Sequence, residues 1–407
     1  MDILILSPYP PYPPHGGGTM RIYQIIRGLA ARHRVTCLTF APDAAAERAL
    51  EPLRAICRVL TVRGPEPRSP LRRAWTTLAS PLPDMALRNA SAAYRAALAE
   101  LLAREHFDVV QAESIEMAGY LHASPTRPAL LILDQFNAEF VLQRRAFLAD
   151  AQRPARWHAA AYSLAQWRKL AGYERRVMRG CNAVLAVSDD DRATLGRLAP
   201  RTPIAVVPNG VDAAHFSRAA LRGGLSFGGP AVVFSGTLDF RPNVDAAVWF
   251  AGTVWPQIRA ACPDARLVLV GKRPAPALRR LSHDPSVVVV GEVPDARPYL
   301  AGASVYVVPM RIGGGVRLKL LEALALEAPV VSTRMGAEGI SGLRDSEHCL
   351  LADQPDAFAQ AVLRLIDNPA LGAQLGAAGR GLVAAHYDWS VIIPKLDALY
   401  QELVASL

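Results

Sequence analysis

The sequence has few cysteines and no long apolar run. Its five cysteines stand singly, without a Cys-x-x-Cys pair or histidines at metal-ligand spacing, so we expect reduced thiols and no structural metal. No stretch approaches the roughly 18–20 consecutive apolar residues of a membrane span. Asp2 stands where a secretory signal would carry Lys or Arg. These absences favour a cytoplasmic protein.

Several catalytic signatures are missing as well. There is no His-Glu-x-x-His pair and no Gly-x-Ser-x-Gly elbow. Gly16-Gly17-Gly18 begins like a dinucleotide fingerprint, but Arg21 stands where the third glycine belongs, which disfavours hydride transfer. The Asp-x-Asp within residues 189–191 could bind a divalent cation, yet it lies between a strand and a helix, where acidic residues complement the helix dipole. We interpret it as a helix start and expect neither a metal nor a cofactor.

The chain does contain a repeated alternation of short apolar runs with stretches of helical period. A length of 407 residues with 51% hydrophobic residues suits two α/β domains. The predicted strands of the first domain are Ile3–Leu6, Val35–Phe40, Val59–Val62, Phe107–Val110, Ala129–Leu133, Ala183–Val187 and Ile204–Val207. Those of the second are Val232–Phe234, Leu267–Val270, Val287–Val290, Val305–Val308 and Val330–Ser332. This alternation is typical of parallel βαβ units, and the glycine-rich stretch Arg218–Pro230 predicts a linker.

The positive charge is concentrated in the first half of the chain. Of a net charge of +9, residues 1–215 contribute most, with 27 Lys and Arg against 19 Asp and Glu. A local group of arginines lies close to two apolar residues: Arg63, Arg68, Arg72 and Arg73, with Trp75 and Leu78. Two interpretations stay open, a contact with anionic lipid or a phosphorylated acceptor, and a solvated loop and helix face. The sequence shows no nucleic-acid-binding motif, so we expect no nucleic-acid partner.

The strongest chemical signal lies in the run Val307–Ala325. A buried strand ends at Pro309, the glycines 313–315 follow, and a helix is predicted to begin near Gly315 with Leu318, Leu321 and Ala325 on its core face. Lys319 and Glu322 share the opposite face with Gly315. Exposed backbone N–H groups and a lysine suit a diphosphate, and a carboxylate can accept hydrogen bonds from ribose hydroxyls. The alternative is an ordinary Lys–Glu surface pair.

These residues resemble the donor-site signature of the family 4 retaining glycosyltransferases (glycosyl transferases group 1). The segments that carry the resemblance are Gly313–Ala325, Pro329–Thr333, Pro208–Asp212, Phe234–Gly236, Val268–Gly271, Tyr387–Trp389 with Leu399-Tyr400, and Gly16–Gly18. The resemblance implies an α/β GT-B fold with two doubly wound Rossmann-like domains that face each other across a cleft. It places the acceptor domain at residues 1–212, the nucleotide-sugar domain at 213–385, and a last helix, 386–407, that crosses back to the first domain. It also implies retention of anomeric configuration and no obligatory metal.

Carried over by position, the resemblance assigns the donor site. Glu322 matches the family's ribose-binding glutamate, whereas Gly314 stands where a second glutamate usually contacts the sugar. The stretch 236–243 lacks the family's phosphate-binding lysine, so Arg317 and Lys319 are expected to supply that charge. Lys319, Arg317 and Glu322 are thus the predicted catalytic residues. The predicted donor-binding residues also include Gly17, Gly18, Gly236, Arg241, Val293, Gly313, Gly314 and Gly315.

The acceptor side is predicted where the strand Ala129–Leu133 leads into a helix. Relatives often carry His-Asn here, and this chain has Phe136-Asn137. Asn137 and Glu139 are therefore predicted substrate-binding residues, with Asp134 as a further polar candidate. The alternative for Asn137 is an N-cap of a helix over 138–148.

The resulting hypothesis is a glycosyltransferase that moves a sugar from a nucleotide-diphosphate-sugar donor. Its acceptor would be a glycan, a lipid-linked saccharide or a small molecule, reached either in the cytoplasm or at the inner face of an anionic membrane. Two alternatives stay open: a catalytically silent nucleotide-sugar-binding protein, in which Gly314 and Phe136 record a lost active site, and a nucleotide-sugar epimerase of the same architecture.

Overall fold

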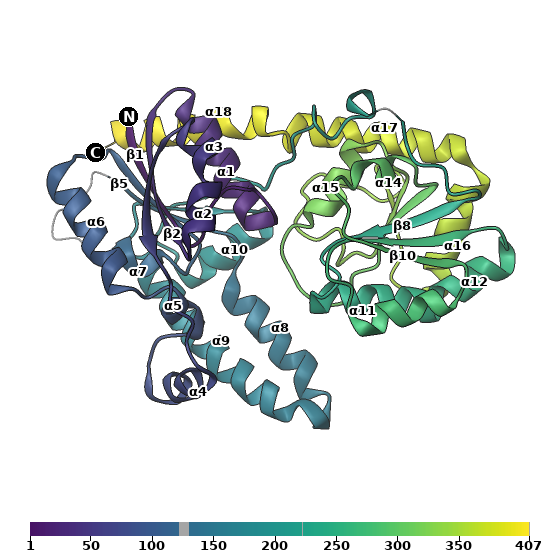
Figure 1. The fold of residues 1–407 in the computed structure, drawn as a ribbon, viewed down its shortest axis with the longest axis horizontal. Helices are drawn as coiled ribbons and strands as arrows, with labels where there is room; N and C mark the ends of the chain where they lie inside the picture. Colours follow the sequence, from purple (N-terminus) through teal and green to yellow (C-terminus); the bar gives the residue numbers. More distant parts are fainter. Residues whose placement is uncertain (122–129, 222, 407) are drawn as a thin grey trace. The chain divides into compact units, whose positions relative to one another are not determined.

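The computed structural model describes residues 1–121, 130–221 and 223–406, which form two compact units (Figure 1). The first unit comprises Met1–Asn209 with Ile393–Leu407, and the second comprises Gly210–Ile392. Ala129, which we placed in a predicted strand, lies outside the described residues. All five cysteines are free; four are buried and Cys262 is partly exposed.

The first unit is built on a seven-stranded parallel sheet with the order β3-β2-β1-β4-β5-β6-β7. Strand β1 contains a continuous apolar run, as expected for a parallel strand that is covered on both faces; Ile3, Leu4, Ile5 and Leu6 are fully buried. The strands are β1 (Asp2–Ser7), β2 (Arg34–Ala41), β3 (Arg58–Arg63), β4 (Val109–Glu113), β5 (Leu130–Gln135), β6 (Ala183–Ala186) and β7 (Ile204–Val206).

Helices connect these strands. They are α1 (Gly17–Ala30), α2 (Ala44–Ala49), α3 (Glu51–Arg54), α4 (Pro70–Ala79), α5 (Asp84–Arg88), α6 (Ala92–Arg104), α7 (Ala118–Leu121), α8 (Glu139–Ala151), a 3₁₀ turn (Pro154–Arg156), α9 (Trp157–Met178) and α10 (Asp189–Leu198). Helices α8 and α9 form a hairpin that projects from the sheet, with α4 beside α9 (Figure 1). The C-terminal helix α18 (Trp389–Ala405) belongs to this unit from Ile393 on, where Asp397 Oδ1 lies 2.7 Å from His33 Nε2.

The second unit repeats the pattern with a six-stranded parallel sheet of order β10-β9-β8-β11-β12-β13. Its strands are β8 (Ala231–Ser235), β9 (Arg266–Val270), β10 (Val287–Gly291), β11 (Val305–Val308), β12 (Val330–Ser332) and β13 (Leu350–Leu351). The prediction of an α/β fold with two doubly wound sheets is confirmed.

The helices of the second unit include one π-helical stretch. They are a 3₁₀ turn (Arg218–Ala220), α11 (Arg241–Trp249), the π segment (Phe250–Val254), α12 (Trp255–Ala261), α13 (Pro276–Arg279), a 3₁₀ turn (Arg280–His283), α14 (Arg297–Ala301), α15 (Leu318–Ala325), α16 (Pro355–Asp367) and α17 (Pro369–His386). Residues 218–230, which we predicted as a linker, lie within this unit, where the amide of Leu225 donates to the carbonyl of Pro298 at 3.0 Å. The chain instead passes between the units at residues 209–210 and 392–393.

The strand order reverses once in each sheet. In the first unit β1 lies between β2 and β4, and in the second unit β8 lies between β9 and β11. Ligands of open α/β sheets bind at such a reversal, beside the carboxyl ends of the strands. The loops after β1 and β4, and those after β8 and β11, are therefore where functional residues are expected.

Candidate active site

In the second unit, the loop after β8 and the helix α15, which follows β11, bring Gly236 and Lys319 together. The Lys319 ammonium donates a hydrogen bond to Asn243 Oδ1 at 2.8 Å and lies 4.3 Å from the centre of the Phe234 ring. A Cβ built on Gly236 would lie only 2.7 Å from Lys319 Nζ, and Gly236 has a φ of +149°. The glycine is thus required both for its backbone conformation and for the approach of the lysine.

Lys319 and Glu322 are both half-buried, and their electrostatics differ from those of a surface pair. Loss of solvation lowers the pKa of Lys319 to about 7; Arg317 adds to that effect and Glu322 opposes it. Loss of solvation raises the pKa of Glu322 to about 7, and Lys319 opposes this shift. Among the described residues no ion pair joins the two side chains. The geometry is therefore unlike the exposed pair that was the alternative interpretation.

The glycine-rich loop determines where α15 begins. Gly313 and Gly315 have positive φ values of 106° and 77°, so the chain cannot be helical there. The helix starts at Leu318, which corrects our prediction of a start near Gly315. Of the predicted core face, Leu321 and Ala325 are fully buried and Leu318 packs partly buried against the core; Leu320 is buried as well. Arg317, at the N-cap, donates through Nη1 to the carbonyl of Gly314.

Two further predicted donor residues, Arg241 and Val293, lie at the same edge of this sheet, whereas Gly17 and Gly18 belong to the first unit. Arg241 is exposed at the first position of α11, and Val293 follows β10 and packs partly on the core. A Cβ on Gly271 would lie 1.7 Å from the carbonyl oxygen of Gly236, so the loops after β8 and β9 touch backbone to backbone. Arg311, which follows β11, forms an ion pair with Asp245 at 3.0 Å.

The sequence alone does not reveal Asn243 and Phe234 as partners of Lys319. The distance of 76 residues between Lys319 and Asn243 gives no local pattern. One signal was present: the stretch 236–243 lacks the family's usual lysine, and Asn243 now contacts the lysine that enters from α15.

In the first unit, Gly17 and Gly18 form the start of α1. Gly16, the N-cap, has a φ of +110° and provides no side-chain cap for the N–H groups of the first turn. A Cβ on Gly18 would lie 2.0 Å from the hydroxyl of Tyr9 and 3.2 Å from the Phe136 ring. The glycine loop after β1 therefore contacts the loop after β5.

Asn137 and Glu139 are brought together at the start of α8. Asn137 Nδ2 donates to Glu139 Oε1 at 3.1 Å, and burial raises the pKa of Glu139 to about 7. Asn137 does not cap the helix, which corrects the alternative interpretation: α8 begins at Glu139, and its N-cap is Ala138.

Two carboxylates from other helices accept hydrogen bonds from backbone amides at the start of α8, so this helix does not need Asn137 as its N-cap. The amide of Ala138 donates to Asp191 Oδ1 at 3.1 Å, and that of Phe140 donates to Glu174 Oε1 at 2.9 Å. Asp191 is in turn fixed in the first turn of α10, as the interpretation of residues 189–191 as a helix start predicted; the Ser188 hydroxyl donates to Asp191 Oδ2 at 2.6 Å.

Asp134 is not available to a substrate, which corrects its status as a candidate. Both of its oxygens accept hydrogen bonds from the buried Arg21 guanidinium, at 2.7 and 2.8 Å. The same guanidinium donates to the carbonyl of Pro208 at 3.1 Å and to Asn209 Oδ1 at 3.2 Å. Arg21 thus connects β5 to residues 208–209, where the N-terminal part of the first unit ends. This gives a structural reason for an arginine at this position.

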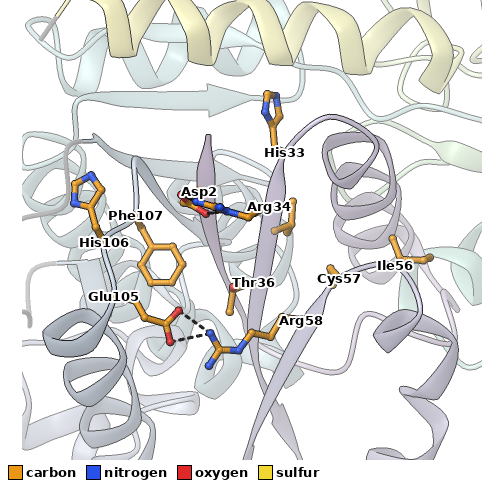
Figure 2. Close-up of a pocket in the computed structure, with 11 residues that line it drawn as sticks. Asp2, His33, Arg34, Thr36, Ile56, Cys57, Arg58, Glu105, His106 and Phe107 are labelled. Carbon is orange, nitrogen blue, oxygen red and sulfur yellow. Dashed lines mark hydrogen bonds and ion pairs between the residues drawn. The ribbon is translucent and has the colours of Figure 1, made fainter.

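A cavity of about 620 Å³ opens at the opposite edge of the first sheet, where β1, β2 and β3 begin (Figure 2). Its charged groups are already paired, Arg58 with Glu105 and Arg34 with Asp2. The amino ends of parallel strands are not where such folds bind substrates. We therefore do not assign the site to this cavity.

Comparison with known proteins identifies the family. Residues 15–215 match the model of Glycosyltransferase Family 4, and residues 229–368 match that of Glycosyl transferases group 1. Together the two matches cover most of the chain. The chain belongs to the family 4 glycosyltransferases.

Two curated relatives show what this chain is similar to. A phosphatidyl-myo-inositol mannosyltransferase of Mycobacterium tuberculosis is 32% identical over 212 residues, which cover 49% of this chain and 54% of the relative. A GDP-mannose-dependent monoacylated alpha-(1-6)-phosphatidylinositol monomannoside mannosyltransferase of Corynebacterium glutamicum is 29% identical over 214 residues, which cover 48% of this chain and 55% of the relative. The chain thus spans about half the length of the curated relatives it matches.

Solved structures match over the whole chain at low identity. Sucrose-phosphate synthase from Thermosynechococcus elongatus has a TM-score of 0.72 at 20% identity and covers 100% of each chain. HepE of Anabaena, solved in complex with UDP, has a TM-score of 0.68 at 15% identity, again with 100% of each chain covered. At these identities the likeness shows the fold, which is GT-B.

Proposed function

We propose that this family 4 glycosyltransferase moves a hexose from a nucleoside diphosphate sugar to a lipid-linked acceptor, with retention of configuration and without a metal. The observation that carries the proposal is the Lys319 ammonium, held beside Gly236 by Asn243 and the Phe234 ring. A cation in this position, at the reversal point of the second sheet, suits an anionic leaving group.

The donor residues have separate roles in this proposal. Lys319 and Arg317 neutralise the diphosphate as it departs, and Glu322 accepts hydrogen bonds from ribose hydroxyls. The N–H groups of Gly17 and Gly18, at the start of α1, are further groups that bind substrate. The names of the curated relatives make GDP-mannose the first donor to test.

The transfer step is proposed from the family resemblance, which implies retention of configuration. The acceptor hydroxyl attacks the anomeric carbon on the face that the diphosphate leaves, the anomeric C–O bond breaks, and a departing phosphate oxygen takes the acceptor proton. The negative charge on the diphosphate grows during this step, so a fixed cation stabilises the transition state more than the ground state.

The acceptor is proposed from the same relatives, which are named for transfer to phosphatidylinositol and its mannosides. Asn137 and Glu139 would orient the acceptor hydroxyl from the start of α8. Glu139, with a pKa raised to about 7 by burial, can either donate or accept a hydrogen bond near neutral pH.

We also propose that α4 brings the enzyme to the membrane surface. Leu71, Trp75 and Leu78 are 84%, 69% and 84% exposed and lie at i, i+4 and i+7, so they form one apolar stripe. The helix is fixed at both ends: Ser69 Oγ accepts from the amide of Arg72, and Lys169 of α9 donates to the carbonyl of Ser80 at 2.7 Å. No helix within the described part of the chain combines the length and apolarity needed to span a bilayer.

The test is a transfer assay on the full chain with GDP-mannose and vesicles that contain phosphatidylinositol, with the product's anomeric configuration read by NMR. We expect a mannosylated lipid with the donor's configuration. Lys319→Met should abolish transfer, whereas Lys395→Met, an exposed lysine on α18, should not. Donor binding without turnover would favour the silent binding protein. An epimerised donor without transfer would favour the epimerase.

A further inference from the structure

A second cavity in the first unit, of about 410 Å³, is lined by arginines and by the start of a helix. It lies among the segment that leads into α4, the helix α4 itself, the end of α5 and the start of α6. Its lining contains one acidic residue, Glu66, against four arginines: Arg63, Arg68, Arg72 and Arg88.

The backbone at the start of α6 adds hydrogen-bond donors to this cavity. The Ser91 amide donates to the Tyr120 hydroxyl at 2.9 Å, and the Tyr94 amide donates to Ser91 Oγ at 3.2 Å. The amides of Ala92 and Ala93, which line the cavity, have no acceptor among the residues that the structure describes. Two outward N–H groups at the positive end of a 13-residue helix favour an anion.

The arginines are only partly neutralised by the protein. Arg68 donates through Nη2 to Asp84 at 2.7 Å, and Arg88 donates to Glu116 at 2.7 Å. Arg68 Nη1 is buried without a hydrogen-bond acceptor in the described ranges. Within the arginine group at 63–73, Asp84 forms ion pairs with both Arg68 and Arg73.

Arg63 and Arg72 carry positive charges that no carboxylate neutralises within the described residues. Both are exposed, and within residues 1–121, 130–221 and 223–406 neither forms an ion pair with a carboxylate. Among the described residues, the cavity therefore contains the guanidinium groups of Arg63 and Arg72, which form no ion pair, and that of Arg68, whose Nη1 has no acceptor. Two N–H groups at the start of α6 and the Thr76 side chain also line it. Planar guanidinium forks and helix N–H groups are the donors that recognise the oxygens of a phosphate.

We propose that this cavity is a phosphate-ester site, separate from the donor residues of the second unit. The ester is either the headgroup of a phospholipid or a soluble phosphorylated molecule. The apolar stripe of Leu71, Trp75 and Leu78 lies on the same helix as Arg72 and Thr76. A phospholipid could contact two surfaces of α4 at the same time. Its phosphate would bind in the cavity, and its acyl region would pack against the apolar stripe. Binding to this site requires no donor and no transfer.

The test uses the full chain without donor and measures binding to two probes. One is sn-glycerol 3-phosphate, followed by calorimetry; the other is vesicles of phosphatidylcholine with or without phosphatidylglycerol, followed by sedimentation. The variant is Arg63→Gln with Arg72→Gln, which touches no ion pair. The control, Arg48→Gln with Arg201→Gln, removes the same charge from exposed positions elsewhere in the first unit.

We expect the Arg63/Arg72 variant to lose roughly ten- to a hundredfold in affinity at an unchanged melting temperature, and the control to lose little. Vesicle binding that glycerol phosphate displaces would identify a lipid headgroup as the ligand. Binding of glycerol phosphate without vesicle binding would identify a soluble ester. Equal losses in the variant and the control would reduce the effect to net charge and overturn the proposal, as would wild-type affinity in the variant. None of these outcomes depends on glycosyl transfer, so they stand apart from the proposed activity.

Discussion

Lys319 pairs with Asn243, 76 residues earlier in the chain, and not with Glu322 on the same helix. An amide partner leaves the ammonium without a counter-ion, and the Phe234 ring beneath it holds the cation without cancelling its charge. In its protonated form Lys319 can therefore bind an anionic ligand, and the lack of a counter-ion among the described residues is consistent with its lowered pKa.

This arrangement predicts different kinetic effects for the two side chains of α15. Removing a charged hydrogen-bond partner of a ligand costs about 1.5–3 kcal/mol, so Glu322→Ala should weaken donor binding roughly ten- to a hundredfold. Lys319→Ala should lower kcat more than donor affinity, because it meets charge that grows toward the transition state. Steady-state kinetics and melting curves measure both. Near-wild-type kcat/KM in the two variants would remove our assignment of the donor site.

Donor binding should take up protons near pH 8. With a pKa of about 7, Lys319 is largely neutral there, and Glu322, also near 7, is largely ionised. A diphosphate beside Lys319 raises the pKa of the lysine, which therefore binds a proton on association. Ribose hydroxyls that donate to Glu322 favour its ionised form, which already predominates at this pH, and a nucleoside diphosphate sugar has no phosphate that titrates near neutrality. Calorimetry in buffers of different ionisation enthalpy measures the uptake. The Lys319→Arg/Glu322→Gln variant cannot titrate and should show none; proton release by the wild type would contradict the site.

The close approach of Lys319 to Gly236 predicts that replacing this glycine impairs catalysis. In Gly236→Ala the new Cβ would meet Lys319 Nζ at 2.7 Å, and the backbone would be strained at a φ of +149°. We expect at least a tenfold loss of kcat/KM, together with lower stability, from displacement of the lysine. Gly252→Ala is the matched control in the same unit, because nothing lies within 4 Å of its Cβ. A loss of stability alone, with normal kinetics in the folded fraction, would show that Lys319 tolerates the shift.

The sequence predicted the sheets well because a buried parallel strand is a continuous apolar run. Val305–Val308 and Val330–Ser332 have the bounds that we predicted. It missed β13, Leu350–Leu351, because two residues at a sheet edge carry no periodicity. It also missed the start of α15, since helical spacing continues through Gly315 although that glycine has a φ of +77°.

The sequence predicted the neighbours within the candidate site only where they belong to the same segment of the chain. Lys319 and Glu322 share a helix, so their common face follows from spacing alone. The Arg21–Asp134 pair spans 113 residues, and it forms only when helix α1 packs beside strand β5 in the folded unit. Nothing local distinguishes such a structural aspartate from a substrate-binding one.

Activity should survive excess EDTA. Asp189 and Asp191 have partners in the protein: Asp189 pairs with Arg192 at 2.8 Å, and Asp191 accepts from Ala138 and Ser188. In the described ranges no three His, Cys, Asp or Glu side chains are grouped as metal ligands. Turnover measured with EDTA, and again after addition of Mg²⁺ or Mn²⁺, checks this. Complete loss that either ion restores would show that the reaction needs a metal.

The exposed stripe of α4 predicts which tryptophan contacts the membrane. Trp75 and Trp157 are similarly exposed, at 69% and 63%, but Trp75 is flanked by Leu71 and Leu78, whereas Trp157 stands at the start of α9. Burying a large apolar side chain contributes about 1.5–3 kcal/mol, so Trp75→Ser should lower partitioning into anionic vesicles by roughly tenfold or more. Trp157→Ser should change it little. The arginines beside the stripe add an electrostatic component, so partitioning of the wild type should also fall as salt rises. Loss in Trp157→Ser but not in Trp75→Ser would move the contact to the α8–α9 hairpin, and equal binding to neutral and anionic vesicles would remove the role of the arginines.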